Sequence, residues 1–260
     1  MNSQVHTFET LVPATLLKRY KRYLADVVTQ GGEEVTVHCP NPGRMSSILP
    51  QARRIFLTDL RGQPNPKRKL DYRWELAQVE ETLVLVNTQV ANKVAQKLLH
   101  HNDDLRAQLG LTPGREIKAE TTIENEDRIK SRFDFGFLAS CGRDAYLEVK
   151  QVTLRVADQD GRRWAAFPDA VSARGQRHLL ELARLSERGH PTYLLYIVGR
   201  NDVDAVRAAH EVDAEYARAL RVAVASGVKV FAARIRATVE GLFFDGWLPV
   251  LDPVSKPDAS

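Results

Sequence analysis

The segment Ser131–Leu154, with the sequence SRFDFGFLASCGRDAYLEVKQVTL, decides the fold of the second half of the chain. Apolar residues alternate with others in both halves of this segment, which predicts the two strands of a hairpin. Gly142 and the polar residues around it supply the turn. One face of the first strand is expected to carry Phe133, Phe135 and Phe137.

Three charged residues fall on the other face of this predicted hairpin, namely Asp134 in the first strand and Glu148 and Lys150 in the second. Two carboxylates beside an ammonium group can hold a hard divalent cation, Mg²⁺ or Mn²⁺, next to a phosphate. The spacing Asp–x(n)–Glu–x–Lys is similar to the pattern of the PD-(D/E)XK nuclease group. The alternative is a solvated hairpin that carries only a surface ion pair.

The overall composition sets the class of protein. A chain of 260 residues suggests two domains or one large one. The net charge of +4 and a pI near 9.1 favour an anionic partner. Cys39 and Cys141 lie far apart in sequence, which argues against a disulfide framework and fits a reducing compartment. No apolar run approaches the roughly 20 residues of a membrane helix, so we expect a cytoplasmic protein without a membrane partner.

Short strands and turns fill the first third of the chain. The expected strands are Leu16–Val28, Glu34–Cys39, Arg53–Thr58, Tyr72–Val79 and Thr82–Val86. Five short strands without a helical period predict a small closed β-barrel of the OB kind, which we assign to residues 1–86. Such barrels often bind oligonucleotides, although the fold alone does not prove this function.

Helices and buried strands fill residues 87–252. Helices are expected over Ala91–His101, from Phe167-Pro168-Asp169 to Gly189, and over Asp213–Ala225. Thr192–Val198 and Val228–Ala232 are apolar runs typical of strands buried on both faces. Strands that alternate with helices imply parallel neighbours, so the second domain is predicted to be α/β. Residues 253–260 are predicted to form a flexible tail.

Several blocks along the chain resemble the SfsA family of sugar fermentation stimulation proteins. These blocks are KRYKRYLAD at Lys18–Asp26, HCPN at His38–Asn41, PKRK at Pro66–Lys69, WEL at Trp74–Leu76, VNT at Val86–Thr88, SRFDF at Ser131–Phe135, EVKQVTL at Glu148–Leu154, FPDAV at Phe167–Val171 and RGQ at Arg174–Gln176. The resemblance implies an OB-like first domain and a PD-(D/E)XK-like second domain. It also implies DNA binding with little sequence preference and a role in regulating sugar (maltose) metabolism.

The chain departs from the family pattern at two places. After HCPN the family usually continues Thr-Gly, whereas this chain has Pro42, Gly43 and Arg44, which replaces a polar turn contact by a positive charge. Lys97 stands in the first helix of the second domain where the family often carries a glutamate. Lys97 cannot bind a metal ion, and this departure weakens the case for DNA cleavage more than the case for binding.

Phosphodiester cleavage would divide the roles among a few residues. Asp134, Glu148 and the carbonyl of Val149 would hold the cation, and Lys150 would hold the water or the phosphate. Gln176 is a candidate for orienting the same water, with helix packing as the alternative. Glu120 matches a family glutamate and is a candidate third acidic ligand, with a solvent-facing strand residue as the alternative.

Basic residues near the barrel predict the contacts to DNA. The residues expected to bind phosphates are Lys18, Arg19, Lys21, Arg22, Lys67, Arg68, Lys69 and Arg174. Alternation in a continuous strand would place Lys18, Tyr20 and Arg22 on one face, where the ring can stack on a base. The alternative is an edge strand protected by lysines. Three functions therefore stay open: a DNA-binding regulator, an active Mg²⁺- or Mn²⁺-dependent nuclease, and a protein that binds small anions or sugar phosphates.

Overall fold

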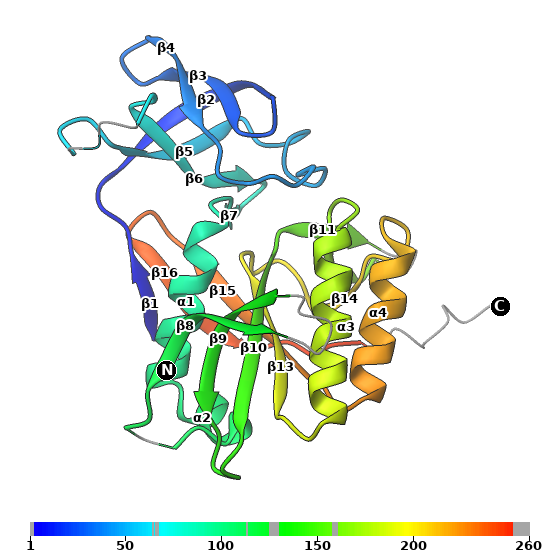
Figure 1. Cartoon of the computed structure of the whole chain (residues 1–260). Coiled ribbons are helices and arrows are strands. Elements are labelled where there is room, and N and C mark those ends of the chain that lie inside the picture. Colours follow the sequence, from blue (N-terminus) through cyan, green and yellow to red (C-terminus); the bar gives the residue numbers. More distant parts are fainter. Residues whose placement is uncertain are drawn as a thin grey trace.

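The computed structural model describes residues 3–63, 65, 68–112, 114–124, 130–157 and 161–251. Lys67 and the predicted tail at 253–260 lie outside the described residues. Figure 1 shows a β-barrel at one end and a larger layered α/β unit at the other, so the predicted mixed α/β class is confirmed. Within the described residues, no helix is long and apolar enough to cross a membrane.

A six-stranded sheet forms the N-terminal OB domain. Its strands are β2 (Leu11–Tyr20), β3 (Leu24–Thr29), β4 (Glu34–His38), β5 (Arg54–Asp59), β6 (Tyr72–Val79) and β7 (Thr82–Leu85). They lie in the order β4-β3-β2-β5-β6-β7, and a parallel bridge between His38 and Arg73 joins β4 to β6 and closes the sheet. The fully buried Trp74 fills the interior, where its indole donates to the carbonyl of Leu76 at 2.9 Å. This closure buries the apolar interior of the barrel.

The basic stretch Lys18–Asp26 is a hairpin, so the predicted single strand over Leu16–Val28 is wrong. β2 ends at Tyr20 and β3 begins at Leu24, and these two residues pair with each other. Lys21 and Arg22 between them have φ values of 47° and 63°, the left-handed backbone typical of tight hairpin turns. Arg22 therefore does not continue the face that carries Lys18 and Tyr20.

A seven-stranded sheet organises the second domain, in the order β1-β16-β15-β13-β10-β9-β8. Its strands are β1 (Gln4–Thr7), β8 (Ile117–Glu124), β9 (Lys130–Leu138), β10 (Asp144–Val152), β13 (Thr192–Val198), β15 (Lys229–Ala237) and β16 (Gly241–Trp247). β9 and β10 form the predicted antiparallel hairpin, and β10, β13 and β15 run parallel as predicted. β1 pairs with β16, so the assignment of all of residues 1–86 to the barrel is wrong for Gln4–Thr7.

Helices cover both faces of this sheet (Figure 1). α1 (Gln89–His101) and α2 (Asp103–Leu109) pack on one face, and α3 (Ala173–Glu187) and α4 (Ala214–Ala225) pack on the other. All seven residues of β13 are buried between these layers, which confirms the prediction of a strand buried on both faces. A smaller sheet of β11 (Leu154–Ala157), β12 (Arg163–Phe167) and β14 (Ala205–Ala208) continues from the end of β10.

The helix expected from Phe167 begins later. Phe167 ends β12, and α3 begins at Ala173 after its N-cap residue Ser172, whose side chain accepts a hydrogen bond from the Gly175 amide at 3.1 Å. The proline at 168 resembles a first-turn proline in sequence, but the serine supplies the capping oxygen. The segment between β12 and α3 is therefore a loop, and it lies between the two domains.

The prediction that three phenylalanines share one face of β9 is confirmed for Phe135 and Phe137 and is wrong for Phe133. These two rings pack beneath α1, whereas Phe133 lies on the α3 side, 5.8 Å from the Tyr146 ring and 5.9 Å from the His178 ring. The pairing of β9 with β10 ends at Phe135 and Leu147. Alternation fails at Asp134 because the two strands separate there, and the fork exposes polar side chains to the space between the domains.

Buried ions join the barrel to the second domain. Arg200 is fully buried and donates to both oxygens of Asp202, at 2.6 and 2.7 Å, and to the carbonyl of Thr153 at 2.9 Å. It also donates to the hydroxyl of Ser47, a barrel-side residue, at 3.3 Å. Arg155 contacts the same Asp202 at 2.6 Å. This network fixes the barrel on the second domain through ions shielded from water.

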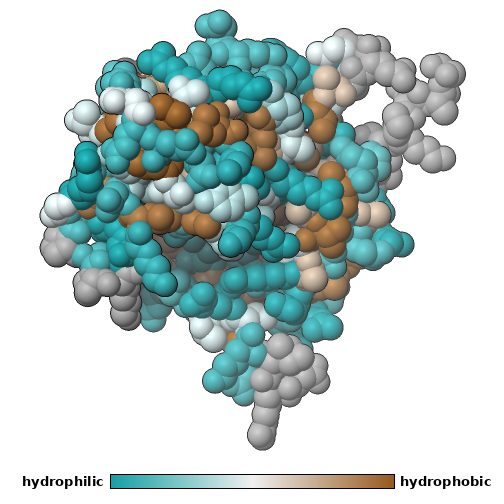
Figure 2. Space-filling view, turned by 90° about the horizontal axis from the view of Figure 1, so that it is seen from above, coloured by the Kyte–Doolittle hydropathy of each residue, from teal (hydrophilic) through white to brown (hydrophobic). Residues whose placement is uncertain are grey.

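The surface on the barrel side is mostly hydrophilic, with separate hydrophobic patches (Figure 2). The two cysteines do not form a disulfide, since Cys39 is buried in the barrel and Cys141 is exposed at the turn between β9 and β10. This arrangement agrees with the absence of a disulfide framework expected from the sequence.

Candidate metal centre and interdomain cleft

The fork between β9 and β10 brings Asp134 and Glu148 together. The register of the hairpin places these two residues opposite each other, one position beyond the last paired residues. One oxygen of Asp134 accepts from the side-chain amide of Asn92 on α1 at 2.7 Å, and the other accepts from the backbone amide of Val149 at 2.8 Å. Each carboxylate oxygen has two lone pairs, so both retain one for a further partner.

Glu148 is buried beside two basic groups. Its Oε1 contacts the ammonium group of Lys150 and lies 2.7 Å from Nδ1 of His178 on α3. Its Oε2 is buried and has no hydrogen-bond partner. A buried anionic oxygen without a partner carries a large desolvation cost, which a cation bound there would offset.

The charges at the fork shift the two carboxyl groups in opposite directions. Burial and the neighbouring charge of Glu148 raise the pKa of Asp134. Burial would also raise the pKa of Glu148, but the hydrogen bonds from His178 and Lys150 and the charge of Lys150 outweigh it and hold that pKa below its ordinary value. Glu148 is therefore the carboxylate that stays ionised most readily, and Asp134 is the one whose charge needs a cation.

His178 positions Glu148 and was not among the predicted residues. Nε of Arg174 lies 3.4 Å from Nε2 of His178. A guanidinium group can only donate, so Nε2 accepts and the ring proton sits on Nδ1, where it donates to Glu148. In sequence, His178 lies four positions after Arg174, on the same side of the helix. Asn92 was likewise missed, because nothing local links it to Asp134.

Two of the predicted site residues lie elsewhere. Gln176 donates to both oxygens of Asp213, the N-cap of α4, at 2.9 and 3.1 Å, so the proposal that it orients a water at the fork is not supported. The Glu120 side chain is 72% exposed and lies 3.5 Å from Arg132. Among the described residues there is no group of three or more acidic, histidine or cysteine side chains able to hold a metal ion. The fork offers two carboxylates, which is sufficient for Mg²⁺ because it keeps several waters.

A cleft of about 610 Å³ lies between the barrel and the second domain. Asn92, Val149 and Lys150, which contact the two carboxylates, line its floor. The other basic residues that line it are Arg19, Arg22 and Arg44. The acidic pair at the fork therefore lies next to a cavity whose walls carry positive charge.

The other predicted basic residues are dispersed. Lys18 is 68% exposed and pairs with Asp26 at 3.2 Å, while Lys21 occupies the hairpin turn. Arg68 and Lys69 line a different pocket of the barrel. Arg19 lies in the cleft, but its guanidinium donates to the carbonyls of Arg22 and Asn41 at 2.7 and 2.6 Å. The cleft thus gathers only part of the predicted set.

Comparisons with known proteins agree with this architecture. Residues 17–86 match the SfsA N-terminal OB domain, and residues 89–241 match the sugar fermentation stimulation protein RE domain. A sugar fermentation stimulation protein homolog of Pseudomonas entomophila is 41% identical over 245 residues, covering 94% of this chain and 98% of that protein. A homolog of Dinoroseobacter shibae is 40% identical over 256 residues, covering 96% and 97%. The chain belongs to the sugar fermentation stimulation protein family.

A solved structure of this family has the same fold. SfsA of Pyrococcus furiosus in complex with Ca²⁺ is similar with a TM-score of 0.79 and 24% sequence identity, covering 96% of this chain and 99% of that one. The two residues at which the sequence departs from the family pattern are both placed. Arg44 lines the cleft and contributes its charge there, and Lys97 lies at an exposed position of α1. Asn92, five residues earlier on α1, is the residue that reaches Asp134.

Gly43, in the loop that follows the HCPN block, leaves space for the side chain of Asp169 from the second domain. A Cβ atom at Gly43 would overlap the Asp169 carboxylate, whose Oδ2 accepts from the Met45 amide at 3.2 Å. We expect Gly43→Ala to destabilise the protein by about 1–3 kcal/mol in urea unfolding, because the loop or the carboxylate must move. Gly31→Ala is the matched control, since its nearest atom lies at 3.8 Å. Equal stability of the two variants would contradict this account.

Proposed function

We propose that this protein binds the phosphate backbone of DNA, with little sequence preference, in the cleft between its two domains. The observation that carries the proposal is the position of Arg19, Arg22 and Arg44 on the cleft walls, next to the fork that holds Asp134 and Glu148. Phosphate contacts of this kind give an affinity that does not depend on sequence.

A divalent cation, Mg²⁺ or Mn²⁺, is the proposed cofactor. Asp134 and the buried Oε2 of Glu148 would hold it, and the carbonyl of Val149 is a further candidate ligand. The solved relative from P. furiosus is described in complex with Ca²⁺, which supports a divalent cation in this fold. When bound, the cation neutralises phosphate charge and lowers the pKa of its water. Asn92 and the Val149 amide orient Asp134 toward it.

Cleavage of DNA is the second candidate function, and the position of Lys150 favours it. Its ammonium group contacts Glu148 and also lines the cleft, where it can hold a phosphate oxygen or a water. Purified protein incubated with single- and double-stranded DNA in Mg²⁺ and in Mn²⁺ separates the two functions. Cleavage that is lost in both Asp134→Asn and Lys150→Ala supports the nuclease. Binding without cleavage leaves a DNA-binding protein with a nuclease-like core.

The salt dependence of DNA affinity tests the role of the cleft. Between about 50 and 200 mM salt, the affinity is expected to fall steeply as counterions are released. Arg22→Ala and Arg44→Ala should each weaken binding to all sequences alike and lower the salt slope by about 1. Arg236→Ala is the control, because Arg236 stacks over Phe243 in the second domain and does not line the cleft. An affinity independent of salt would instead favour a protein that binds small anions.

A regulatory role in sugar (maltose) metabolism, exerted in the cytoplasm, completes the proposal. Its support is the family membership, since the relatives are named for the stimulation of sugar fermentation. We expect a chromosomal Arg22→Ala Arg44→Ala double variant to reduce induction of maltose-utilisation transcripts. Unchanged induction, with DNA binding lost in the purified protein, would separate the regulatory role from the cleft.

A further inference from the structure

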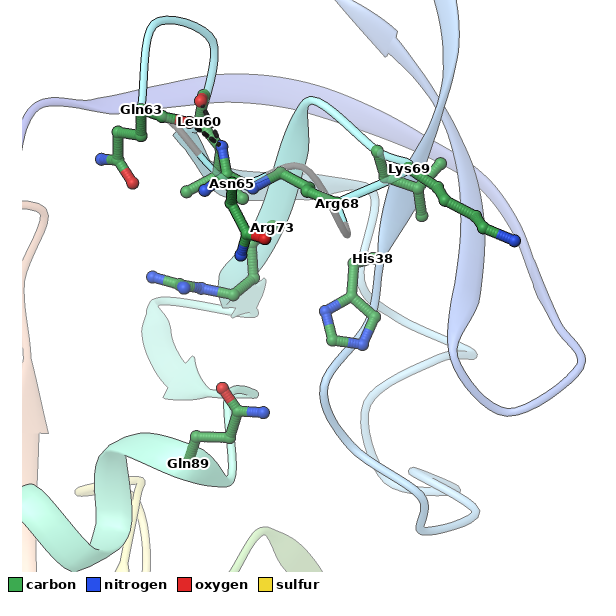
Figure 3. A pocket seen from close by; sticks show the side chains of 9 residues that line it. His38, Leu60, Gln63, Asn65, Arg68, Lys69, Arg73 and Gln89 are labelled. Carbon is green, nitrogen blue, oxygen red and sulfur yellow. Dashed lines mark hydrogen bonds between the residues drawn. The ribbon is translucent and has the colours of Figure 1, made fainter.

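The barrel carries a second cavity, separate from the interdomain cleft. It has a volume of about 380 Å³ and shares no lining residue with that cleft. Figure 3 shows Arg73 reaching between the loop that carries Asn65 and the start of α1, with His38 facing the same space from the other side. The basic and polar side chains that line this barrel pocket are His38, Gln63, Asn65, Arg68, Lys69, Arg73 and Gln89. None of the described residues that line it is acidic.

An ion pair with the buried Glu75 holds Arg73 in place. Its Nε donates to Oε1 of Glu75 at 2.6 Å, and Glu75 is only 1% exposed. Glu75 also accepts from the hydroxyl of Thr58 at 2.8 Å and from the side-chain amide of Asn87 at 2.7 Å. Glu75 therefore lies behind the guanidinium group, which points its other nitrogens into the pocket. A donor fork fixed in this way loses little entropy when it binds an anion.

The remaining walls add charge and polarity. Lys69 is exposed at the rim, and Arg68 donates to the carbonyls of Leu60 and Gln63 at 2.5 and 3.0 Å, which shapes the rim loop. Because Glu75 balances Arg73, the charges of Arg68 and Lys69 leave the pocket positive. Gln89 is the first residue of α1, a helix without an acidic residue in its first turn, so the positive end of the helix dipole acts in the same direction.

We propose that the barrel pocket binds the phosphate monoester of a small hydroxylated compound. Arg73 would bind the phosphate with its guanidinium fork. Lys69, which Figure 3 shows pointing outward from the rim, would turn inward to add its ammonium group, because these two groups match a dianion. His38 and Gln89 would hydrogen-bond hydroxyl groups. Burial and the charge of Arg73 lower the pKa of His38, which keeps the ring neutral and leaves it one donor and one acceptor. The volume falls within the range of pockets for small ligands. This proposal does not depend on DNA binding.

Calorimetric titration with glucose 6-phosphate tests it, with glucose as the control that lacks the phosphate. Glucose 6-phosphate is expected to bind and glucose is not. Lys69→Ala and Arg73→Lys should each weaken binding by roughly tenfold, the usual effect of losing one charge-assisted contact. Arg54→Ala should have no effect, because Arg54 stacks over Phe56 on the barrel without lining the pocket. Lys69 is exposed, so its variant should fold, and thermal melting verifies this for Arg73→Lys.

The His38 ring gives an independent readout by NMR. The charges of Arg73 and Glu75 act on it, and its ring centre lies 6.4 Å from that of Tyr23. A dianion beside it should raise its pKa in wild type, and in Lys69→Ala the same rise should need a roughly tenfold higher ligand concentration. Failure of glucose 6-phosphate to bind, or binding that the two variants do not weaken, would overturn the proposal. A second result would also overturn it. If a 5′-phosphorylated oligonucleotide binds and Lys69→Ala weakens that binding, while glucose 6-phosphate does not bind, then the pocket recognises the phosphate at the end of a nucleic-acid strand.

Discussion

Replacing Asp134 by asparagine is expected to weaken the binding of Mn²⁺ by at least about a hundredfold. Loss of a residue that only orients a ligand typically costs 10- to 100-fold in metal affinity, so loss of a carboxylate ligand should cost no less. The amide keeps the shape of the side chain and can still accept from Asn92 or from the Val149 amide, but it removes the negative charge that a cation would neutralise at the fork. Calorimetric titration of the protein with Mn²⁺, without DNA, measures the effect.

Two further variants turn this prediction into a graded series. Asn92→Ala removes the hydrogen bond of 2.7 Å to Asp134 and should weaken Mn²⁺ binding by about tenfold. Glu120→Gln removes an exposed carboxylate paired with Arg132 and should change it less than about twofold, because this charge is screened by water. If Glu120→Gln weakens Mn²⁺ binding as much as Asp134→Asn does, Glu120 is a metal ligand.

Asp202→Asn is expected to destabilise the protein by about 3–5 kcal/mol, the usual cost of leaving a buried charge without its partner. Asp202 accepts both hydrogen bonds from the fully buried Arg200 and a third from Arg155. Asparagine cannot balance either guanidinium group. The free energy of unfolding in urea measures the loss. Asp204→Asn is the matched control, since Asp204 and Arg163 form an exposed pair at 3.6 Å that should contribute less than about 1 kcal/mol.

The contacts of Asp202 with Arg200 and Arg155 also make the stability of the protein depend on pH. Burial would raise the pKa of Asp202, but Arg200 and Arg155 outweigh it and hold that pKa below its ordinary value. The unfolded chain therefore binds this proton more readily than the folded one. The contribution of Asp202 is complete above its ordinary pKa and is lost as the pH falls through the folded value. Wild type should lose more stability than Asp202→Asn over this acid range, and parallel curves would contradict the assignment.

Local patterns made the second domain predictable, and long-range contacts account for the errors. The β9–β10 hairpin and the buried strand β13 follow from alternation and from a continuous apolar run, which need only neighbouring residues. The pairing of β1 with β16 joins the two ends of the chain, and no local pattern reveals it. The turn at Lys21 and Arg22 was missed because neither residue is a usual turn residue.

The candidate site divides in the same way. Asp134, Glu148 and Lys150 lie in one hairpin, so their convergence could be predicted from spacing. His178 and Asn92 reach the fork from helices on opposite faces of the sheet, and only the packing of α1 and α3 brings them there. Gln176 lies two residues before His178 on α3. Residues two positions apart point to different sides of a helix, so Gln176 contacts Asp213 and does not reach the fork.

The DNA affinity of the wild-type protein in Ca²⁺ and in EDTA, measured by fluorescence anisotropy on a duplex of arbitrary sequence at fixed ionic strength, tests the central claim most directly. If a cation held by Asp134 and Glu148 meets the DNA backbone in the cleft, Ca²⁺ should tighten binding by roughly tenfold, a gain that Asp134→Asn should abolish. Equal affinity in Ca²⁺ and EDTA, or a gain that persists in the variant, would contradict the claim.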